Sequence, residues 1–184
     1  MNARWILPLL LSACAAPAPP APAAPPAPAI FQTSVCGRID RFNVCGPVFL
    51  ASQPGAEDFA FLKRAGVRTV INLRQEGELK EFDERKLAGE LGLEYVSLPF
   101  GSPDELTDAV FDRARELLTS SNKAILLHCH SGNRVGAIWL ARRVLDDSQS
   151  YESALAEAHT VGLATPALEQ KAQDYIERHR PASR

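Results

Sequence analysis

The chain has 184 residues, of which 46% are hydrophobic and 23% charged, and it carries a formal charge of −2 with a pI near 6.1. This length suits one domain with a proper core and is short for two. The near-neutral charge gives no electrostatic reason to expect nucleic-acid binding. No apolar run reaches the roughly 18 residues that a membrane-spanning helix needs.

The chain starts with a segment typical of a secretory signal. Arg4 precedes an apolar run at residues 5–11, and Leu-Ser-Ala-Cys completes the segment at residue 14. Because the cysteine directly follows Leu-Ser-Ala, the segment resembles a bacterial lipoprotein signal, in which Cys14 becomes the acylated first residue. Ala15 follows the cysteine, which in Gram-negative lipoproteins implies the outer membrane. We therefore expect a lipid-anchored protein of the bacterial cell envelope that faces the periplasm; an ordinary signal peptide with an incidental cysteine is the alternative.

Residues 15–29 consist of eight alanines and seven prolines. Such a segment forms neither a helix nor a core, and at about 3.1 Å per residue it predicts an extended spacer of roughly 45 Å. The chain is accordingly divided into a signal peptide at 1–13, a lipidated cysteine with its Ala/Pro tether at 14–29, and a domain at 30–184 whose core covers about 46–180.

Two cysteines, Cys36 and Cys45, stand at the start of this domain. An oxidising compartment favours a disulfide between them. Two separate thiols are the alternative, because spacing alone does not fix the geometry that a disulfide requires.

Hydrophobic patterning alternates between strands and helices along the domain. Short apolar runs bounded by Gly or Pro predict strands, and apolar residues three or four positions apart predict helices. In chain order we expect a strand at 48–51, a helix at 56–65, a strand at 67–73, an exposed helix at 78–91, a strand at 93–98, an amphipathic helix at 104–118, a strand at 124–127, and helices at 134–145, 151–159 and 166–179. This alternation favours an α/β domain with a mostly parallel central sheet flanked by helices.

The segment that predicts chemistry is Leu-His-Cys-His-Ser-Gly-Asn-Arg at residues 127–134. A strand ends at His128 and a helix opens at Arg134, so the backbone N–H groups between them can converge on an anion. Gly132 allows backbone angles that other residues resist, and the arginine can contact phosphate through two N–H groups. The same surroundings favour a thiolate at Cys129, an in-line nucleophile toward bound phosphate. The pattern predicts phosphoryl transfer to sulfur; a purely structural turn is the alternative.

This loop resembles that of the cysteine-dependent dual-specificity and tyrosine phosphatases. Four residues rather than the usual five separate Cys129 from Arg134, which resembles the branch named after β-lactamase-hydrolase-like proteins. The segments VFLASQP, AGVRTVINLR, HCHSGNRVGAIWLARR and YESALAEAHTVGL resemble the same branch, so the similarity covers about residues 46–175. It implies a dual-specificity-phosphatase-like fold and hydrolysis of phosphate monoesters through a phosphocysteine, with no cofactor and no metal. The substrate would be a phosphorylated protein or a small phosphomonoester.

The resemblance also implies roles for individual residues. Cys129 would be the nucleophile, Arg134 would bind phosphate, and His128 would support the loop. Contacts to substrate are expected from His130, Ser131, Gly132, Asn133 and Arg134. The class uses an upstream Asp as general acid, and Asp104, which stands 25 residues before the cysteine, is the candidate. A carboxylate that stabilises a helix N-terminus is the alternative for this residue.

Several positions limit these expectations. Val135 stands where the class has Ser or Thr after the arginine, which predicts slow hydrolysis of the phosphoenzyme. Arg74 either approaches the pocket or makes a surface salt bridge. His128, Cys129 and His130 do not predict a metal site, because consecutive strand residues point to opposite faces and the sequence has no second ligand cluster.

Two other functions remain as alternatives. A rhodanese-type sulfurtransferase has a similar loop, but the sequence lacks the Asp-Val-Arg strand and the Gly-His-Ile segment that are typical of that class. The second alternative is a non-catalytic phosphate-binding module on a lipid tether, since binding needs only the loop and Arg134.

Overall fold

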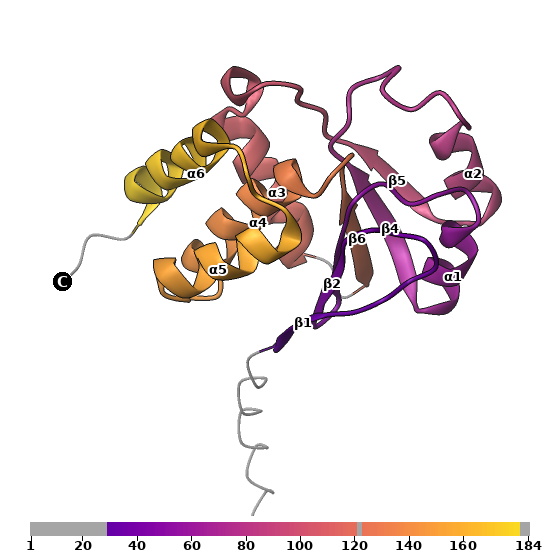
Figure 1. Ribbon diagram of the computed structural model, residues 1–184, viewed down its shortest axis with the longest axis horizontal. Helices are drawn as coiled ribbons and strands as arrows, with labels where there is room; N and C mark the ends of the chain where they lie inside the picture. The colour runs from indigo at the N-terminus through magenta and orange to yellow at the C-terminus, as the bar shows by residue number, and fades with distance from the viewer. Residues whose placement is uncertain (1–28, 121–122, 181–184) are drawn as a thin grey trace, which may run out of the picture.

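The computed structural model describes residues 29–120 and 123–180, in which helices cover both faces of a six-stranded sheet (Figure 1). The strands are β1 (Phe31–Thr33), β2 (Phe42–Cys45), β3 (Val48–Ala51), β4 (Val67–Asn72), β5 (Glu94–Ser97) and β6 (Ala124–His128). Their order in the sheet is β1-β2-β3-β6-β4-β5. The pairs β3–β6, β6–β4 and β4–β5 are parallel, whereas β1–β2 and β2–β3 are antiparallel. The expected α/β class is confirmed.

The helices form two layers around the sheet. They are α1 (Asp58–Arg64), α2 (Glu84–Glu90), α3 (Asp108–Ser120), α4 (Asn133–Leu145), α5 (Tyr151–Val161) and α6 (Pro166–His179), with a short 3-10 helix η1 (Pro103–Glu105) before α3. Helices α1 and α2 cover one face, and α3 to α6 cover the other (Figure 1). Helix α4 is buried almost all round, as expected from apolar residues that occupy every side of it. This burial fixes the start of α4 relative to the end of β6.

The structure differs from the expected elements in three places. The predicted helix at 78–91 is helical only as α2, because Gly77 has a left-handed φ of 82° and Asp83 caps the helix by accepting a hydrogen bond from the Lys86 N–H at 2.9 Å. The predicted helix at 104–118 is split into η1 and α3. Strands β1 and β2 were not predicted, since both are short and lack a clear alternation of polar and apolar residues.

The structure does not contain the disulfide considered between Cys36 and Cys45, and both are free thiols. Cys45 belongs to the larger core cluster, under α3 to α6. Cys36 packs against the smaller cluster, under α1 and α2. The two side chains therefore lie in different hydrophobic layers, which is why no bridge forms.

The predicted signal, Cys14 and the tether through residue 28 lie outside the described residues. The first described residues lead into β1, where Phe31 pairs with Cys45 of β2. Within 29–120 and 123–180, no helix has both the length and the apolar composition needed to cross a membrane.

Candidate active site

The loop between β6 and α4 forms a tight turn around the thiol of Cys129. The side chain of Cys129 is buried, and the Gly132 N–H donates a hydrogen bond to its Sγ at 3.2 Å. Gly132 has a φ of 88°, and a Cβ at this position would lie 2.1 Å from the Val161 carbonyl oxygen at the end of α5. Only glycine fits here, because both the backbone angle and the contact with α5 reject a side chain. The predicted combination of cysteine and glycine therefore gives a sulfur held against backbone N–H at the start of a helix.

The side chain of Asn133, which we expected to contact substrate, anchors the loop to the α5–α6 connection. Its Oδ1 accepts hydrogen bonds from the N–H groups of Ala164 and Thr165, at 2.9 and 3.2 Å. Its Nδ2 donates to Thr165 Oγ1 at 2.7 Å. Asn133 also lines the cleft beside the loop, so its contact with substrate stays a prediction.

Arg134 is held in place by three residues from two loops, the one after β4 and the one after β5. Its NH1 donates to the carbonyls of Leu73 and Phe100 at 3.1 and 2.8 Å, and NH1 and NH2 donate to the two carboxylate oxygens of Glu78 at 2.7 and 2.6 Å. An arginine has five N–H donors, so these contacts leave Nε–H and one NH2 hydrogen, and the guanidinium also interacts with the Cys129 side chain. These two hydrogens lie on one edge of the guanidinium, and together they can bind two oxygens of a phosphate.

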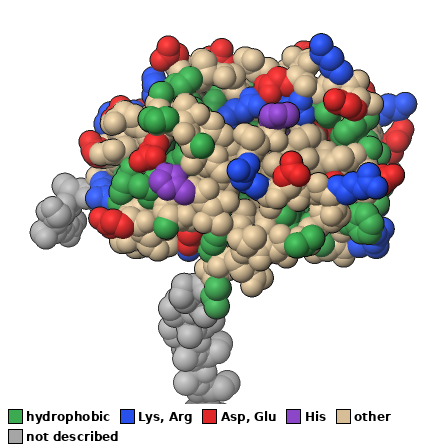
Figure 2. Space-filling view, in the orientation of Figure 1, with side chains coloured by type: hydrophobic (Ala, Val, Ile, Leu, Met, Phe, Trp, Pro, Cys, Tyr) green, Lys and Arg blue, Asp and Glu red, His purple; other side chains and the backbone are tan. Residues whose placement is uncertain are grey.

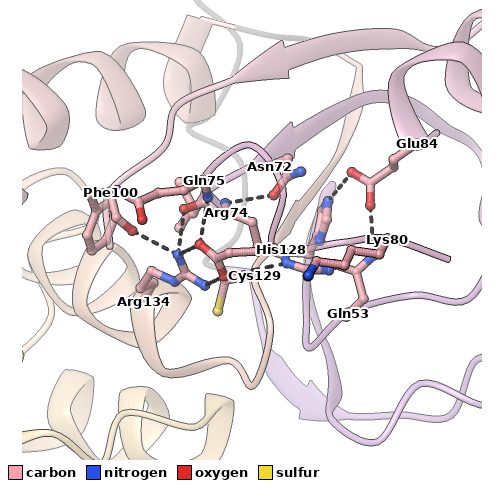
Figure 3. A network of polar contacts seen from close by, with 12 residues as sticks. Gln53, Asn72, Arg74, Gln75, Lys80, Glu84, Phe100, His128, Cys129 and Arg134 are labelled. Atoms are coloured by element: carbon pink, nitrogen blue, oxygen red, sulfur yellow. Dashed lines mark hydrogen bonds and ion pairs between the residues drawn. The ribbon is translucent and has the colours of Figure 1, made fainter. Parts of the chain in front are cut away.

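A chain of polar contacts connects His128 to Arg134, the residues at the two ends of the loop that carries Cys129 (Figure 3). The carboxylate of Glu84 contacts Nε2 of the buried His128 at 2.9 Å and accepts a hydrogen bond from Nε2 of Gln53 at 2.7 Å. Oε1 of Gln53 then accepts from NH1 of Arg74. Arg74 is 4% exposed and its Nε lies 3.6 Å from Glu78, which leads to Arg134. Arg74 therefore belongs to the site and does not make a surface salt bridge.

Sequence reasoning missed Gln53, Glu78 and Glu84, although all three lie in this network. They come from the loop after β3, the loop after β4 and the first turn of α2, respectively. No local motif marks them, because each acts through a residue more than 30 positions away. The Ser-Gln-Pro turn was the one available signal, and it was used only to support the family resemblance.

The charges of this network favour ionised carboxylates. Hydrogen bonds from Arg134 lower the pKa of Glu78 to about 2. Burial raises the pKa of Glu84, but its contact with His128 and its hydrogen bonds with Gln53 and Tyr95 together outweigh burial and leave that pKa below its ordinary value. Both carboxylates therefore stay negative at neutral pH and hold their cationic or N–H partners in fixed directions.

A cleft of about 390 Å³ opens beside the loop. His130, Ser131 and Arg134 line one side of it, and apolar groups of Phe100, Pro103 and Leu168 lie among the lining residues from other segments. In the space-filling view, His, basic and acidic side chains lie close together on the upper edge of the molecule, above the strand ends (Figure 2). The geometry can hold a phosphate by the loop and a carbon skeleton in the cleft.

Asp104, the predicted general acid, lies in η1 and is not among the residues that line this cleft. Its side chain is 97% exposed, and its carboxylate is 3.5 Å from the ammonium of Lys171 on α6. The structure therefore does not bring Asp104 together with Cys129 and Arg134. The titratable side chains that do line the cleft are Glu78, His130 and Arg134.

The described residues contain no cluster of three or more His, Cys, Asp or Glu side chains arranged to hold a metal ion. The imidazole of His128 instead contacts Glu84, on the side of the loop away from the cleft lining. His130 lies at the protein surface. The groups that this site can contribute to a reaction are therefore the Cys129 thiol and the hydrogen-bonding groups around it.

Comparison with known proteins agrees with this geometry. The family model described as "Polymorphic toxin system, DSP-PTPase phosphatase" matches residues 46–145, which are more than half of the chain. A β-lactamase hydrolase-like protein of Xylella fastidiosa is 28% identical over 131 residues, which make up 67% of this chain and 30% of that protein. The chain thus spans less than a third of the length of this curated relative.

Solved structures share the fold. A DUF442 protein of Shewanella putrefaciens has a TM-score of 0.67 at 20% identity, and the match covers 77% of this chain and 95% of that chain. TpbA of P. aeruginosa has a TM-score of 0.62 at 25% identity, with 83% and 91% of the two chains covered, and it has also been solved in complex with phosphotyrosine. The expected dual-specificity-phosphatase-like fold is confirmed.

Proposed function

The chain belongs to the DSP-PTPase phosphatase family, and we propose that it hydrolyses phosphate monoesters through a phosphocysteine on Cys129. The observation that supports this most is the arrangement around the buried sulfur of Cys129. The Gly132 nitrogen lies 3.2 Å from it, and Arg134 interacts with it while keeping Nε–H and one NH2 hydrogen outside its bonds to Leu73, Glu78 and Phe100. The phosphotyrosine complex of TpbA supports aryl phosphates as one substrate class.

The proposed reaction has two steps. First, the Cys129 thiolate attacks phosphorus, the bond between phosphorus and the leaving oxygen breaks, and that oxygen takes a proton from a donor in the cleft. Arg134 and the loop N–H groups stabilise the negative charge on the other phosphate oxygens. In the second step, water attacks the phosphocysteine and releases phosphate and the thiolate. Val135 is buried and has no hydroxyl to assist this step, so we expect it to be the slower one.

For the proton donor, the lining of the cleft favours His130 over Asp104. Arg134 does not release a proton in proteins, and Glu78 is ionised at neutral pH because its pKa is about 2. His130 is the remaining titratable side chain among the described residues that line the cleft. Histidine is the side chain best suited to proton exchange near neutral pH.

We further propose that the domain works in the bacterial cell envelope, on a lipid anchor at Cys14. The support for this location is the sequence alone: a charged start, a short apolar run, and Leu-Ser-Ala before the cysteine. The Ala/Pro tether would then separate the domain from the bilayer. The partners would be a lipid bilayer and a phosphorylated protein or small phosphomonoester.

The decisive experiment measures hydrolysis of an aryl phosphate by the purified chain under reducing conditions, beside Cys129→Ser. We expect metal-independent activity that the variant lacks, and a phosphorylated intermediate that is trapped by rapid acid quenching only in the wild type. Transfer of sulfur from thiosulfate to cyanide is assayed in parallel. Hydrolysis that persists in Cys129→Ser, or sulfur transfer without hydrolysis, would overturn the proposal.

A further inference from the structure

A second cavity, of about 710 Å³, opens next to the active-site cleft and has no part in the proposed reaction. Asn72 and Ser97, at the carboxyl ends of β4 and β5, lie among its lining residues, as do the loop after β4 and the first turn of α2. The cavity and the cleft share Gln75 as a lining residue. Ligands of α/β proteins bind at the carboxyl ends of the strands, so both openings occupy the edge where a ligand is expected.

Three cationic side chains line this cavity, two from the loop after β4 and one from α2. Arg74 follows the end of β4, Lys80 lies in the loop after it, and Arg85 lies in α2. Arg85 is oriented by its contact with Tyr95, since its guanidinium carbon lies 4.8 Å from the ring centroid. Lys80 projects over the polar network that surrounds His128 (Figure 3). The cations are thus positioned on several sides of one space.

The acidic residues of the cavity are mostly engaged elsewhere. Glu84 is buried and bonded to His128 and Gln53, and Asp83 accepts the Lys86 N–H as the cap of α2. Glu76 is the third acid of the lining. By contrast, no described carboxylate forms an ion pair with Lys80 or Arg85. An anionic ligand can therefore contact Lys80 and Arg85 without displacing an ion pair of the described residues.

We infer that this cavity binds a second anionic group, a phosphate or a carboxylate, of the molecule whose phosphate is bound at Cys129. Lys80 would supply a point charge and Arg85 a fork of N–H donors. This inference rests on the proposed function, because it assumes that the first phosphate occupies the loop. Its consequence is selectivity: phosphomonoesters with a second anion nearby are preferred to those without one.

The test compares alkane-diyl bisphosphonates of increasing length with the matching alkyl monophosphonates, which cannot be hydrolysed. Binding to Cys129→Ser is measured by calorimetry, so that the result does not depend on turnover. We expect at least one linker length to bind about tenfold more tightly than its monophosphonate. Lys80→Gln and Arg85→Gln should each reduce this ratio toward one, and both residues are exposed, so their replacement leaves the fold intact.

Lys86→Gln is the matched control, because Lys86 lies in the same helix, is 73% exposed and does not line the cavity. Its ratio should equal that of the parent protein. Equal binding of bisphosphonates and monophosphonates at every length would overturn the inference while leaving the phosphatase proposal intact. Failure of the monophosphonates to bind at all would instead contradict the proposed phosphate site.

The source of the second anion is distinguished with phosphotyrosine peptides. Peptides with Asp or Glu beside the phosphotyrosine are compared with peptides that carry Asn or Gln at the same positions, again by binding to Cys129→Ser. Tighter binding of the acidic peptides that is lost in Lys80→Gln supports the cavity as a subsite for a protein substrate. A gain confined to the bisphosphonates supports a small molecule, and no gain with either probe contradicts the inference.

Discussion

At the scale of single residues, the proposed proton donor, His130, differs from the residue expected from the sequence, Asp104. His130 lines the cleft, whereas Asp104 is 97% exposed and faces Lys171. General-acid catalysis contributes about 100-fold or more when the leaving group is poor. We therefore expect His130→Gln to reduce hydrolysis of phenyl phosphate by about 100-fold and of nitrophenyl phosphate only slightly, because nitrophenolate leaves without a proton.

Asp104→Asn provides the comparison for this prediction. Its rates on the two aryl phosphates, measured as kcat/KM across pH, should stay within about threefold of the wild type, since the carboxylate does not reach the cleft. The opposite pattern would contradict the assignment: a loss in Asp104→Asn that is large for phenyl phosphate and small for nitrophenyl phosphate.

Glu78 permits a prediction about pH because Arg134 lowers its pKa from 4.5 to about 2. A carboxylate with a lowered pKa in the folded state stabilises the protein above its ordinary pKa, and this contribution is lost as pH falls through the lowered value. Glu78→Gln should thus cost about 1 kcal/mol of unfolding free energy at pH 6, after allowance for screening by solvent. Urea unfolding should show this difference vanish between about pH 4.5 and pH 2.

The control for Glu78 is Glu116→Gln, which removes an exposed i,i+3 pair with Arg113 on α3. Exposed pairs contribute little, so this variant should match the wild type within experimental error at every pH. A difference between Glu78→Gln and wild type that stays constant down to pH 2 would contradict the role assigned to the Arg134 contact.

The residue scale also shows how far sequence could predict the site. Cys129, Gly132 and Arg134 were identified because a strand, a loop and a helix start are adjacent in the chain. Glu78 and Gln53 were not identified, because their hydrogen bonds to residues far away in the sequence depend on how the sheet packs. The bonds from Asn133 to the α5–α6 connection were not predicted either, because they join residues more than 30 positions apart.

At the scale of elements, the most informative contact is the buried pair between α2 and β6. Glu84 is 4% exposed and His128 is fully buried, with 2.9 Å between their polar atoms. Loss of one partner leaves the other buried without its bond. We expect Glu84→Gln to lower the unfolding free energy by on the order of 2 kcal/mol at pH 7, measured by urea denaturation.

This effect should weaken in acid, because the pKa of Glu84 is lowered and its contribution disappears as pH falls through that lowered value. Glu90→Gln, in the same helix, is the control: Glu90 is 61% exposed and pairs only with the exposed Lys86. Equal losses of stability in the two variants would show that burial of the pair has no special importance.

The elements were predicted well where hydrophobic pattern and burial agree. Strands β3 and β6 and helix α4 carry continuous apolar runs, which match their burial on both sides. The segment at 78–83 has the charge pattern of an exposed helix, yet it forms a loop because Gly77 turns the chain and Glu78 is bound to Arg134. A tertiary contact there overrides the local helical preference.

At the scale of the whole molecule, the start of the domain at β1 and the active site lie at opposite ends of the sheet. β1 is antiparallel to β2, which is antiparallel to β3, and β3 is parallel to β6. Consequently β1 starts at the end of the sheet opposite to the one where β6 delivers Cys129, as Figure 1 also shows. Residues that precede β1 therefore enter the domain at the end of the sheet away from the cleft.

The anchor itself gives the last prediction, which concerns residues that the sequence alone describes. If Cys14 is acylated, the chain expressed in a Gram-negative bacterium should incorporate labelled palmitate and sediment with membranes, since each buried CH₂ contributes about 0.8 kcal/mol to membrane binding. Cys14→Ser should lose the label and shift to the soluble fraction. Cys36→Ser, a free thiol within the domain, should keep the wild-type distribution. An unlabelled wild-type chain, or an unchanged distribution in Cys14→Ser, would contradict the lipid anchor while leaving the phosphatase chemistry untouched, because the cleft lies at the far end of the sheet.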